Sequence, residues 1–84
     1  MAKSIVITGS TRGIGLGLAN ELLKRGCKVT ISGRTQLSVD KALASLAEQH
    51  GLERLYGLPC DVSDHAQLSN LWHKAHERFG KIDI

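Results

Sequence analysis

The chain has 84 residues, of which 42% are hydrophobic and 23% charged, so it can form one small globular domain and does not resemble disordered or fibrous sequences. Its formal net charge of +3 comes from basic residues scattered among acidic ones, which gives no sign of a nucleic-acid-binding surface. The apolar run near the N-terminus spans only residues 5–7, too short for a signal peptide or a membrane span, so we expect a cytoplasmic protein with no membrane partner.

The first part of the chain predicts a strand, a helix and a second strand. Residues 4–8 form a β-branched run typical of a buried strand, and residues 28–32, with the sequence KVTIS, form another. Between them, Gly26 follows two basic residues, a combination that ends helices. Helical spacing before this stop predicts one buried face made of Ile14, Leu18, Ala19, Leu22 and Leu23.

The middle of the chain repeats this alternation. Residues 54–59 predict a third strand, although Gly57 and Pro59 are weak strand formers. A helix precedes this strand and stops at Gly51. Its predicted buried face consists of Val39, Ala42, Leu43, Leu46 and Ala47.

The last part of the chain predicts a third helix and the beginning of a fourth strand. Ser63 is the expected N-cap of this helix, and Gly80 ends it. The short run at residues 82–84 predicts the start of the strand. The expected buried face of the helix contains Leu68, Leu71, Trp72, Ala75 and Phe79.

Alternation of strands and helices predicts an α/β fold with a parallel sheet. Right-handed crossovers give the strand order 3-2-1, the first half of a doubly wound, Rossmann-type sheet, to which the fourth strand would add. We therefore predict that residues 1–84 form a partial dinucleotide-binding domain. The same order separates Cys27 from Cys60 by about 15–20 Å, so we expect two free thiols and no disulfide.

A glycine-rich stretch, TGSTRGIG at residues 8–15, connects the first strand to the first helix. A helix N-terminus offers unpaired N–H donors and a positive dipole end, which both favour a phosphate. Gly9, Gly13 and Gly15 lack a Cβ, so the backbone can turn sharply and a ligand can come close. This context predicts a phosphate-binding turn, with a plain helix-start turn as the alternative.

The spacing Thr-Gly-x-x-x-Gly-x-Gly resembles the N-terminal part of the classical short-chain dehydrogenase/reductase family, a Rossmann-type group of nicotinamide-dependent oxidoreductases. Three further stretches match the pattern of that family: SGRT at residues 32–35, CDVSD at 60–64 and FGKIDI at 79–84. Together they span nearly the whole chain. The resemblance implies cofactor contacts from Thr8, Gly9, Ser10, Thr11, Arg12, Gly13, Ile14 and Gly15.

The end of the second strand indicates which nicotinamide cofactor is preferred. An acidic residue there favours NAD, whereas a nearby arginine accommodates the 2′-phosphate of NADP. This chain has Gly33 and then Arg34, with Arg12 as a second cation, so we predict NADP in preference to NAD. Thr35 and Ser32 are expected to add hydroxyl contacts. The alternative is that both arginines are exposed residues without a ligand.

Two residues after the third strand resemble the adenine contacts of the family. By that resemblance the Asp61 carboxylate accepts a hydrogen bond from the exocyclic amine, and Val62 lies beside the ring. The alternative for Asp61 is a cap or turn residue before the third helix.

Catalytic residues are not found in this sequence. The family pattern needs a Ser and a Tyr-x-x-x-Lys, but the single tyrosine, Tyr56, is followed four residues later by Cys60. His73 and His76 share one helix face beside Glu77, but without a third ligand we expect a solvated face and no metal site.

Two interpretations remain. In the first, the chain is the truncated, NADP(H)-binding N-terminal segment of an oxidoreductase that reduces carbonyls or oxidises alcohols of small molecules. In the second, it is a non-catalytic nucleotide-binding or oligomerising half-Rossmann module. Because half of a sheet leaves a hydrophobic edge open, we expect the isolated chain to be weakly stable or to form a homo-oligomer.

Overall fold

The computed structural model describes residues 3–9 and 13–83. Within them, strands and helices alternate along the chain, as the sequence predicts. The strands are β1 (Ser4–Ile7), β2 (Lys28–Gly33) and β3 (Leu55–Pro59), and the helices are α1 (Gly13–Lys24), α2 (Gln36–His50) and α3 (His65–Phe79).

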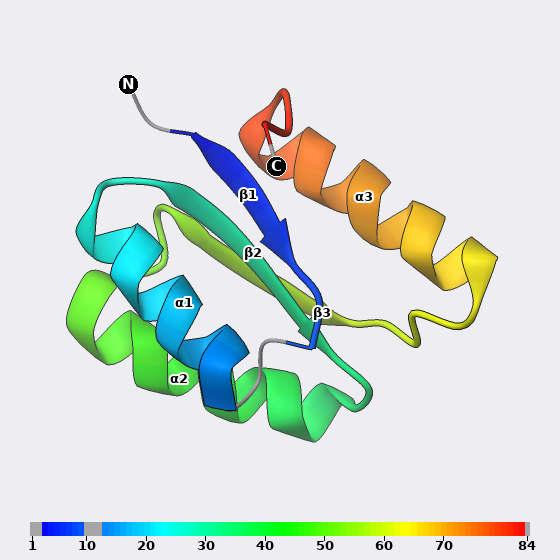
Figure 1. Cartoon of the computed structure of the whole chain (residues 1–84), viewed down its shortest axis with the longest axis horizontal. Helices are drawn as coiled ribbons and strands as arrows, with labels where there is room; N and C mark the ends of the chain where they lie inside the picture. Colours follow the sequence, from blue (N-terminus) through cyan, green and yellow to red (C-terminus); the bar gives the residue numbers. More distant parts are fainter. Residues whose placement is uncertain (1–2, 10–12, 84) are drawn as a thin grey trace.

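The three strands form one parallel sheet in the order β1-β2-β3 (Figure 1). The register pairs Ile5 with Val29 and Val29 with Leu55, so the strands start almost level. A further backbone bond, from Cys60 N–H to the Gly33 carbonyl at 2.8 Å, holds the ends of β2 and β3 together. The predicted order 3-2-1 is confirmed.

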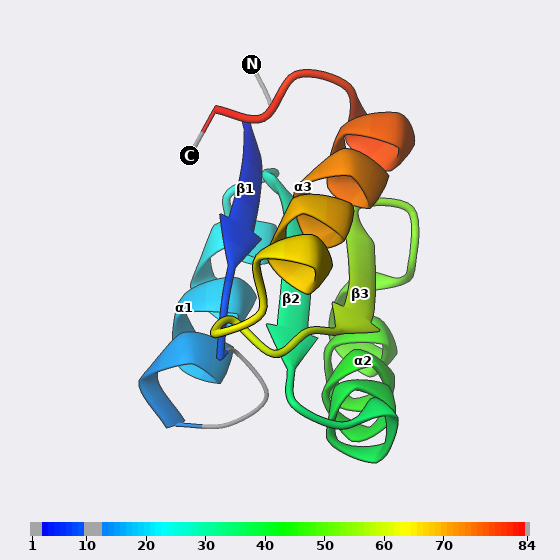
Figure 2. The same cartoon turned by 90° about the vertical axis from the view of Figure 1, so that its right-hand side faces the viewer.

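The helices lie in two layers around the sheet. Figure 2 shows α3 in front of the strands and both α1 and α2 behind them. This is the arrangement of a doubly wound sheet, in which successive crossovers cover opposite faces. The described part of the chain therefore has the architecture of half a Rossmann fold.

The face of the sheet that α1 and α2 cover is apolar. Side chains alternate along a strand, so Val29 and Ile31 point to this face together with Leu55 of the neighbouring strand. All three are buried, and burial of one such side chain stabilises the fold by about 1.5–3 kcal/mol. The core on this face comprises Ala19, Leu23, Val29, Ile31, Ala42, Leu46 and Leu55.

The opposite face of the sheet mixes small hydroxyl residues with apolar ones, because the register places Val6 beside Thr30 and Leu58 beside Ser32. Ser4 and Thr30 are buried there, and their side-chain oxygens have no hydrogen-bond partner among the described residues. From α3, Leu71 and Ala75 are fully buried against the strands. The sheet therefore has one apolar face and one face with polar atoms under a single described helix.

Several predicted helix faces need correction. The predicted face of α2 is confirmed, because Val39, Ala42 and Leu46 are buried. In α1, however, Ile14 and Leu18 are exposed, since the side of the helix that meets the core carries Leu16, Ala19 and Leu23 instead. In α3, the interpretation of Trp72 is wrong: it is 50% exposed, because Leu71 and Ala75 already define the side that meets the sheet.

The helix ends follow the predicted glycines, but one N-cap differs. Gly51 and Gly80 are the C-caps of α2 and α3, as predicted. Asp64, not Ser63, is the N-cap of α3, and its carboxylate accepts from the backbone N–H groups of Ala66 and Gln67. Asp64 satisfies two free donors of the first turn at once, and its charge suits the positive end of the helix.

The segment after α3 returns to the edge of β1. The backbone N–H of Asp83 donates to the Ser4 carbonyl at 2.8 Å, and the Ser4 N–H donates to Asp83 Oδ2 at 2.9 Å. Residues 80–83 do not form a strand, although this contact lies where the fourth strand was expected. The last residue of that prediction, Ile84, lies outside the described residues.

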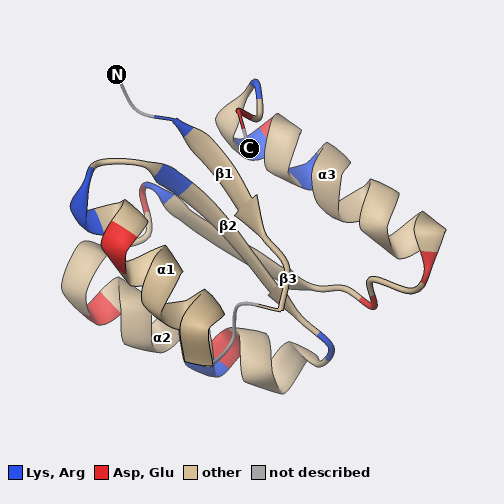
Figure 3. Ribbon diagram, viewed as in Figure 1, with Lys and Arg blue, Asp and Glu red and all other residues tan. Residues whose placement is uncertain are grey.

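Charged residues are interspersed over the fold. Figure 3 shows basic and acidic positions mixed along the helices and loops, with no one region of a single sign. Neither cysteine in the described residues forms a disulfide: Cys27 is half-buried and Cys60 buried. Among the described helices, none combines the length and apolarity that a membrane crossing requires.

Candidate cofactor site

The predicted site residues lie on loops at one end of the sheet. The strands are parallel, so their carboxyl ends meet at the same edge, where the arrowheads in Figure 2 point. Thr8 and Gly9 follow β1, Arg34 and Thr35 follow β2, and Asp61 follows β3. In open α/β sheets this edge is where ligands bind.

The turn between β1 and α1 depends on two glycines with left-handed backbone conformations. Gly9 has φ 62° and Gly13 has φ 66°, values that residues with a side chain rarely adopt. A Cβ built at either position would meet no other described atom within 4 Å. The conformation of the turn, and not packing against the protein, therefore requires glycine at these positions.

This turn leads directly into the N-terminus of α1, a helix of 12 residues. Gly13 is its first residue, and Gly15 is half-buried. Ile14 has an exposed fraction of 91%, so its side chain is open to solvent at the mouth of the turn, and Thr8 is exposed as well. The predicted contacts Ser10, Thr11 and Arg12 lie outside the described residues.

At the end of β2, the three predicted residues have different surroundings. Gly33 is buried, and its carbonyl accepts the hydrogen bond from Cys60 N–H. Arg34 is exposed at the same edge. Thr35 is the N-cap of α2: its Oγ1 accepts from the Ser38 N–H at 3.2 Å and lies 2.8 Å from Ser38 Oγ. The Thr35 hydroxyl therefore has a structural role at the start of α2.

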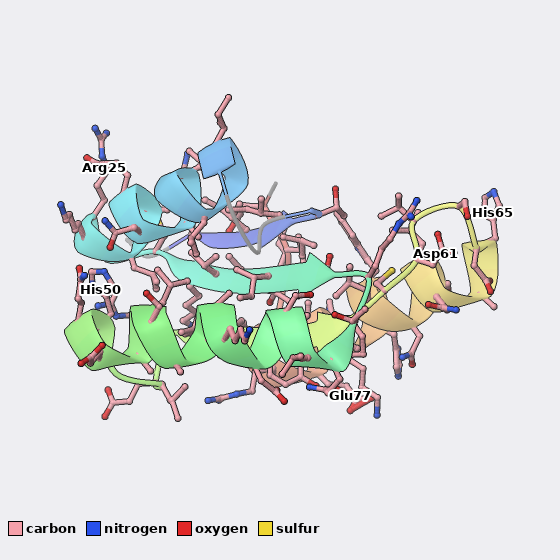
Figure 4. All side chains as sticks on the ribbon, turned by 90° about the horizontal axis from the view of Figure 1, so that it is seen from below. Arg25, His50, Asp61, His65 and Glu77 are labelled. Carbon is pink, nitrogen blue, oxygen red and sulfur yellow. The ribbon has the colours of Figure 1, made fainter. Side chains whose placement is uncertain are left out.

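Asp61 lies in the loop between β3 and α3 (Figure 4), where hydrogen bonds hold it. Its Oδ1 accepts from Ser63 Oγ at 2.7 Å and from Ser63 N–H at 3.0 Å, and its own N–H donates to Gln67 Oε1 at 2.8 Å. The two bonds from Ser63, together with the positive charge of Arg34, hold the pKa of the Asp61 carboxyl below its usual value. The neighbouring Val62 is 54% exposed.

The structure also identifies residues that the sequence analysis did not assign to this edge. Ser63 and Gln67 contact Asp61, and the spacing Asp-x-Ser is a signal for such a turn, because a serine two residues on can donate to the carboxylate. Cys60 directly precedes Asp61 in the chain. Burial of the Cys60 thiol is the main cause that raises its pKa, and the negative charges of Asp61 and Asp64 raise it further.

The other candidate reactive groups lie away from this edge. Tyr56 is half-buried in β3 and lines a groove with Lys74, Glu77 and Arg78 of α3. His73 Nε2 lies 2.8 Å from Glu77 Oε1, an exposed pair on α3. No group of three metal-binding side chains occurs in residues 3–9 and 13–83.

Taken together, the half-doubly-wound sheet, the left-handed glycine turn and the polar loops at one edge define a Rossmann-type nucleotide-binding domain. The family model described as short chain dehydrogenase matches residues 3–84. This chain belongs to the short-chain dehydrogenase family, whose members use nicotinamide dinucleotides.

Individual relatives agree with this assignment. The short-chain dehydrogenase/reductase SDRA of Arabidopsis thaliana is 39% identical over 82 residues, which cover 98% of this chain and 32% of that protein. A short-chain dehydrogenase structure from Novosphingobium aromaticivorans superposes with a TM-score of 0.91 at 35% identity, covering 98% of this chain and 30% of that one. An actinorhodin polyketide ketoreductase with NADPH has a TM-score of 0.90 at 32% identity, with 98% and 31% covered. The chain thus spans about a third of the length of these relatives.

Proposed function

We propose that this chain binds NADP(H) as the adenosine- and phosphate-binding part of a short-chain dehydrogenase/reductase. The observation that carries the proposal is the pair of left-handed glycines, Gly9 and Gly13, at the N-terminus of α1. Arg34 and Asp61 follow the neighbouring strands at the same edge of the sheet. The proposed contacts also include Thr8, Ser10, Thr11, Arg12, Ile14, Gly15, Gly33, Thr35 and Val62.

The glycine turn fits a pyrophosphate. A phosphate must approach the backbone N–H groups at a helix start within hydrogen-bond distance, and side chains at the turn would obstruct it. Gly9 and Gly13 present bare backbone, and no other described atom would meet a Cβ at either residue. The donors and the positive end of the helix dipole would hold the pyrophosphate of the cofactor, whose nicotinamide carries the hydride.

The preference for NADP rests on the loop after β2. Gly33 provides no carboxylate to repel a 2′-phosphate, and the exposed Arg34 guanidinium can pair with its oxygens. The actinorhodin polyketide ketoreductase, whose structure contains NADPH, shares the fold over 98% of the length of this chain. Asp61 and Val62, at the end of the next strand, are the proposed neighbours of the adenine ring.

Isothermal titration of the chain with NADP and with NAD tests this function. We expect tighter binding of NADP, and Arg34→Ala should weaken NADP by about tenfold or more, because a charge-assisted contact is lost, while NAD changes little. Arg25→Ala is the matched control, since Arg25 is also exposed but lies at the opposite end of the molecule from Asp61 in Figure 4. Equal losses for NADP and NAD in Arg34→Ala would overturn the proposed NADP contact.

The reaction of a complete protein is a further proposal. We propose that residues 1–84 are a partial Rossmann domain of an enzyme that interconverts small-molecule alcohols and carbonyls, with catalytic groups outside this chain. Support comes from the family and from the third of a relative's length that the chain covers. The intact mass of the native protein tests it: a mass near 9.1 kDa would contradict the proposal.

A second candidate function is self-association of a non-catalytic module. In the described sheet β1 is an edge strand, and α3 carries an exposed groove of about 560 Å³ that includes Leu68, Trp72 and His76. Unpaired strand edges and exposed aromatic side chains favour association between chains. Light scattering after gel filtration distinguishes the two states, because a monomer at high micromolar concentration would exclude the homo-oligomer.

A further inference from the structure

We propose that Ser63 and Gln67 are positioning residues that hold Asp61 in the orientation needed to recognise the adenine amine. This inference rests on the proposed cofactor function, because it concerns the same edge of the sheet. Neither residue belongs to the glycine turn or to the residues predicted to contact the cofactor. They act through Asp61.

Ser63 fixes the carboxylate of Asp61. Both its hydroxyl and its backbone N–H donate to the same oxygen, Oδ1, at 2.7 and 3.0 Å. Two donors on one oxygen restrict rotation of the side chain, whereas Oδ2 is not used by either bond. An exposed aspartate would otherwise sample several rotamers, and ordering it on binding would reduce affinity.

Gln67 fixes the backbone of the same residue. Its Oε1 accepts from the Asp61 N–H at 2.8 Å, and its Nε2 donates to Asp64 Oδ2 at 3.3 Å. Asp64 in turn caps α3 through Oδ1, which accepts from Ala66 N–H at 2.9 Å and Gln67 N–H at 3.3 Å. Asp61 is therefore connected to the first turn of a helix that is anchored by buried Leu71. Sites supported in this way keep their geometry before the ligand arrives.

The charges around Asp61 agree with a role as an acceptor. The positive charge of Arg34, on the loop after β2, attracts the Asp61 carboxylate. The other acidic residue of the Asp61 loop, Asp64, is engaged as the N-cap of α3. With its pKa below the usual value, the Asp61 carboxyl is ionised at neutral pH. An ionised carboxylate only accepts hydrogen bonds, which matches an amine that only donates.

The test compares NADP with its deamino analogue, in which hypoxanthine replaces adenine and the amine is lost. The unmodified chain should prefer NADP. In Ser63→Ala, NADP should bind about 2–10-fold more weakly, as expected for a lost hydrogen bond, while the deamino analogue changes less. Ser63→Thr should restore the preference because it keeps the hydroxyl. Ser69→Ala, an exposed serine of α3, is the matched control.

A second measurement, independent of the cofactor, is the pKa of the Asp61 carboxyl by NMR in Ser63→Ala and Gln67→Ala. The Ser63→Ala chain should show a higher pKa than the unmodified chain. An unchanged Asp61 pKa in Ser63→Ala would overturn the positioning role while leaving the proposed function intact. Equal weakening of NADP binding and of deamino-analogue binding in this variant would do the same. If the unmodified chain binds neither dinucleotide, the proposed function fails, and with it the role of Ser63 and Gln67 in recognition.

Discussion

The two faces of the sheet are built from different chemistry although they share the same three strands. On one side, Val29, Ile31 and Leu55 pack under α1 and α2. On the other, Ser4 and Thr30 are buried beneath α3, and their hydroxyls have no hydrogen-bond partner among the described residues. A buried hydroxyl without a partner costs about 1–3 kcal/mol, so equal burial does not mean equal stabilisation.

Contacts between elements follow the same division. Arg54 Nη1 donates to the Leu23 carbonyl in the last turn of α1 at 2.8 Å and to the Cys27 carbonyl just after the helix at 3.2 Å. His50 Nε2 lies 2.7 Å from Asn20 Oδ1, which links α2 to α1. We infer that the α1–α2 layer carries most of the stability of the described fold.

The largest expected effect is loss of a core leucine on the apolar face. Leu23→Ala should lower the free energy of unfolding by about 2–5 kcal/mol, because it removes a buried side chain and leaves a cavity. Leu71→Ala, the matched change on α3, should cost less, since Ser4 and Thr30 on that face of the sheet replace part of the apolar surface with hydroxyl groups. Urea unfolding measures both, and equal losses would contradict the difference between the faces.

Two adjacent residues of β2 give the most direct comparison. Val29 and Thr30 are both fully buried but point to opposite faces. Val29→Thr should destabilise by about 1–3 kcal/mol, because it buries a hydroxyl in the apolar core. Thr30→Val should instead stabilise by about 1 kcal/mol, because it removes an unpartnered one. If thermal or urea unfolding finds that Thr30→Val lowers the free energy of unfolding, the buried Thr30 hydroxyl does not destabilise the fold.

Close packing of α2 on β3 gives the next effect. A Cβ at Gly57 would lie 2.9 Å from Ile31 Cγ1 and 3.1 Å from Val39 Cγ1. Gly57→Ala should therefore destabilise by about 1–3 kcal/mol through overpacking. Gly17 is an exposed position of α1, and a Cβ added there would meet no atom within 4 Å. Gly17→Ala should therefore stabilise the fold by about 0.5–1 kcal/mol, so the same urea titration should show opposite signs for the two glycine substitutions.

The smallest effect is expected at Asp61, on the solvent-exposed loop. Its pKa is lower in the folded chain than in the unfolded one, so ionised Asp61 favours folding above the unfolded value of 3.8, and this contribution is lost as the pH falls further. The difference in urea midpoint between the unmodified chain and Asp61→Asn should therefore shrink from pH 6 to pH 3. A constant difference would indicate that the hydrogen bonds of Ser63 do not distinguish the charged form.

Much of the fold was predictable from local patterns. Alternation of β-branched runs with helical spacing predicted the elements, and the handedness of crossovers predicted the strand order, because both depend on neighbouring residues and general chain geometry. The positive φ values of Gly9 and Gly13 agree with the sharp backbone turn predicted from these glycines, since glycine adopts such values without steric cost.

The tertiary structure decided what depends on distant partners. Helical spacing alone placed Trp72 on the buried face of α3, but the position of the sheet leaves it half exposed. Gly57 appeared only as a weak strand residue, yet Ile31 of β2 and Val39 of α2 leave no room for a side chain there. The hydrogen bonds that hold Asp61 likewise required the loop and the first turn of α3 to be placed together. The sequence by itself determined the elements and their order, because these follow from spacing. Which side chains are enclosed, and which atoms they meet, was decided by packing between segments far apart in the chain.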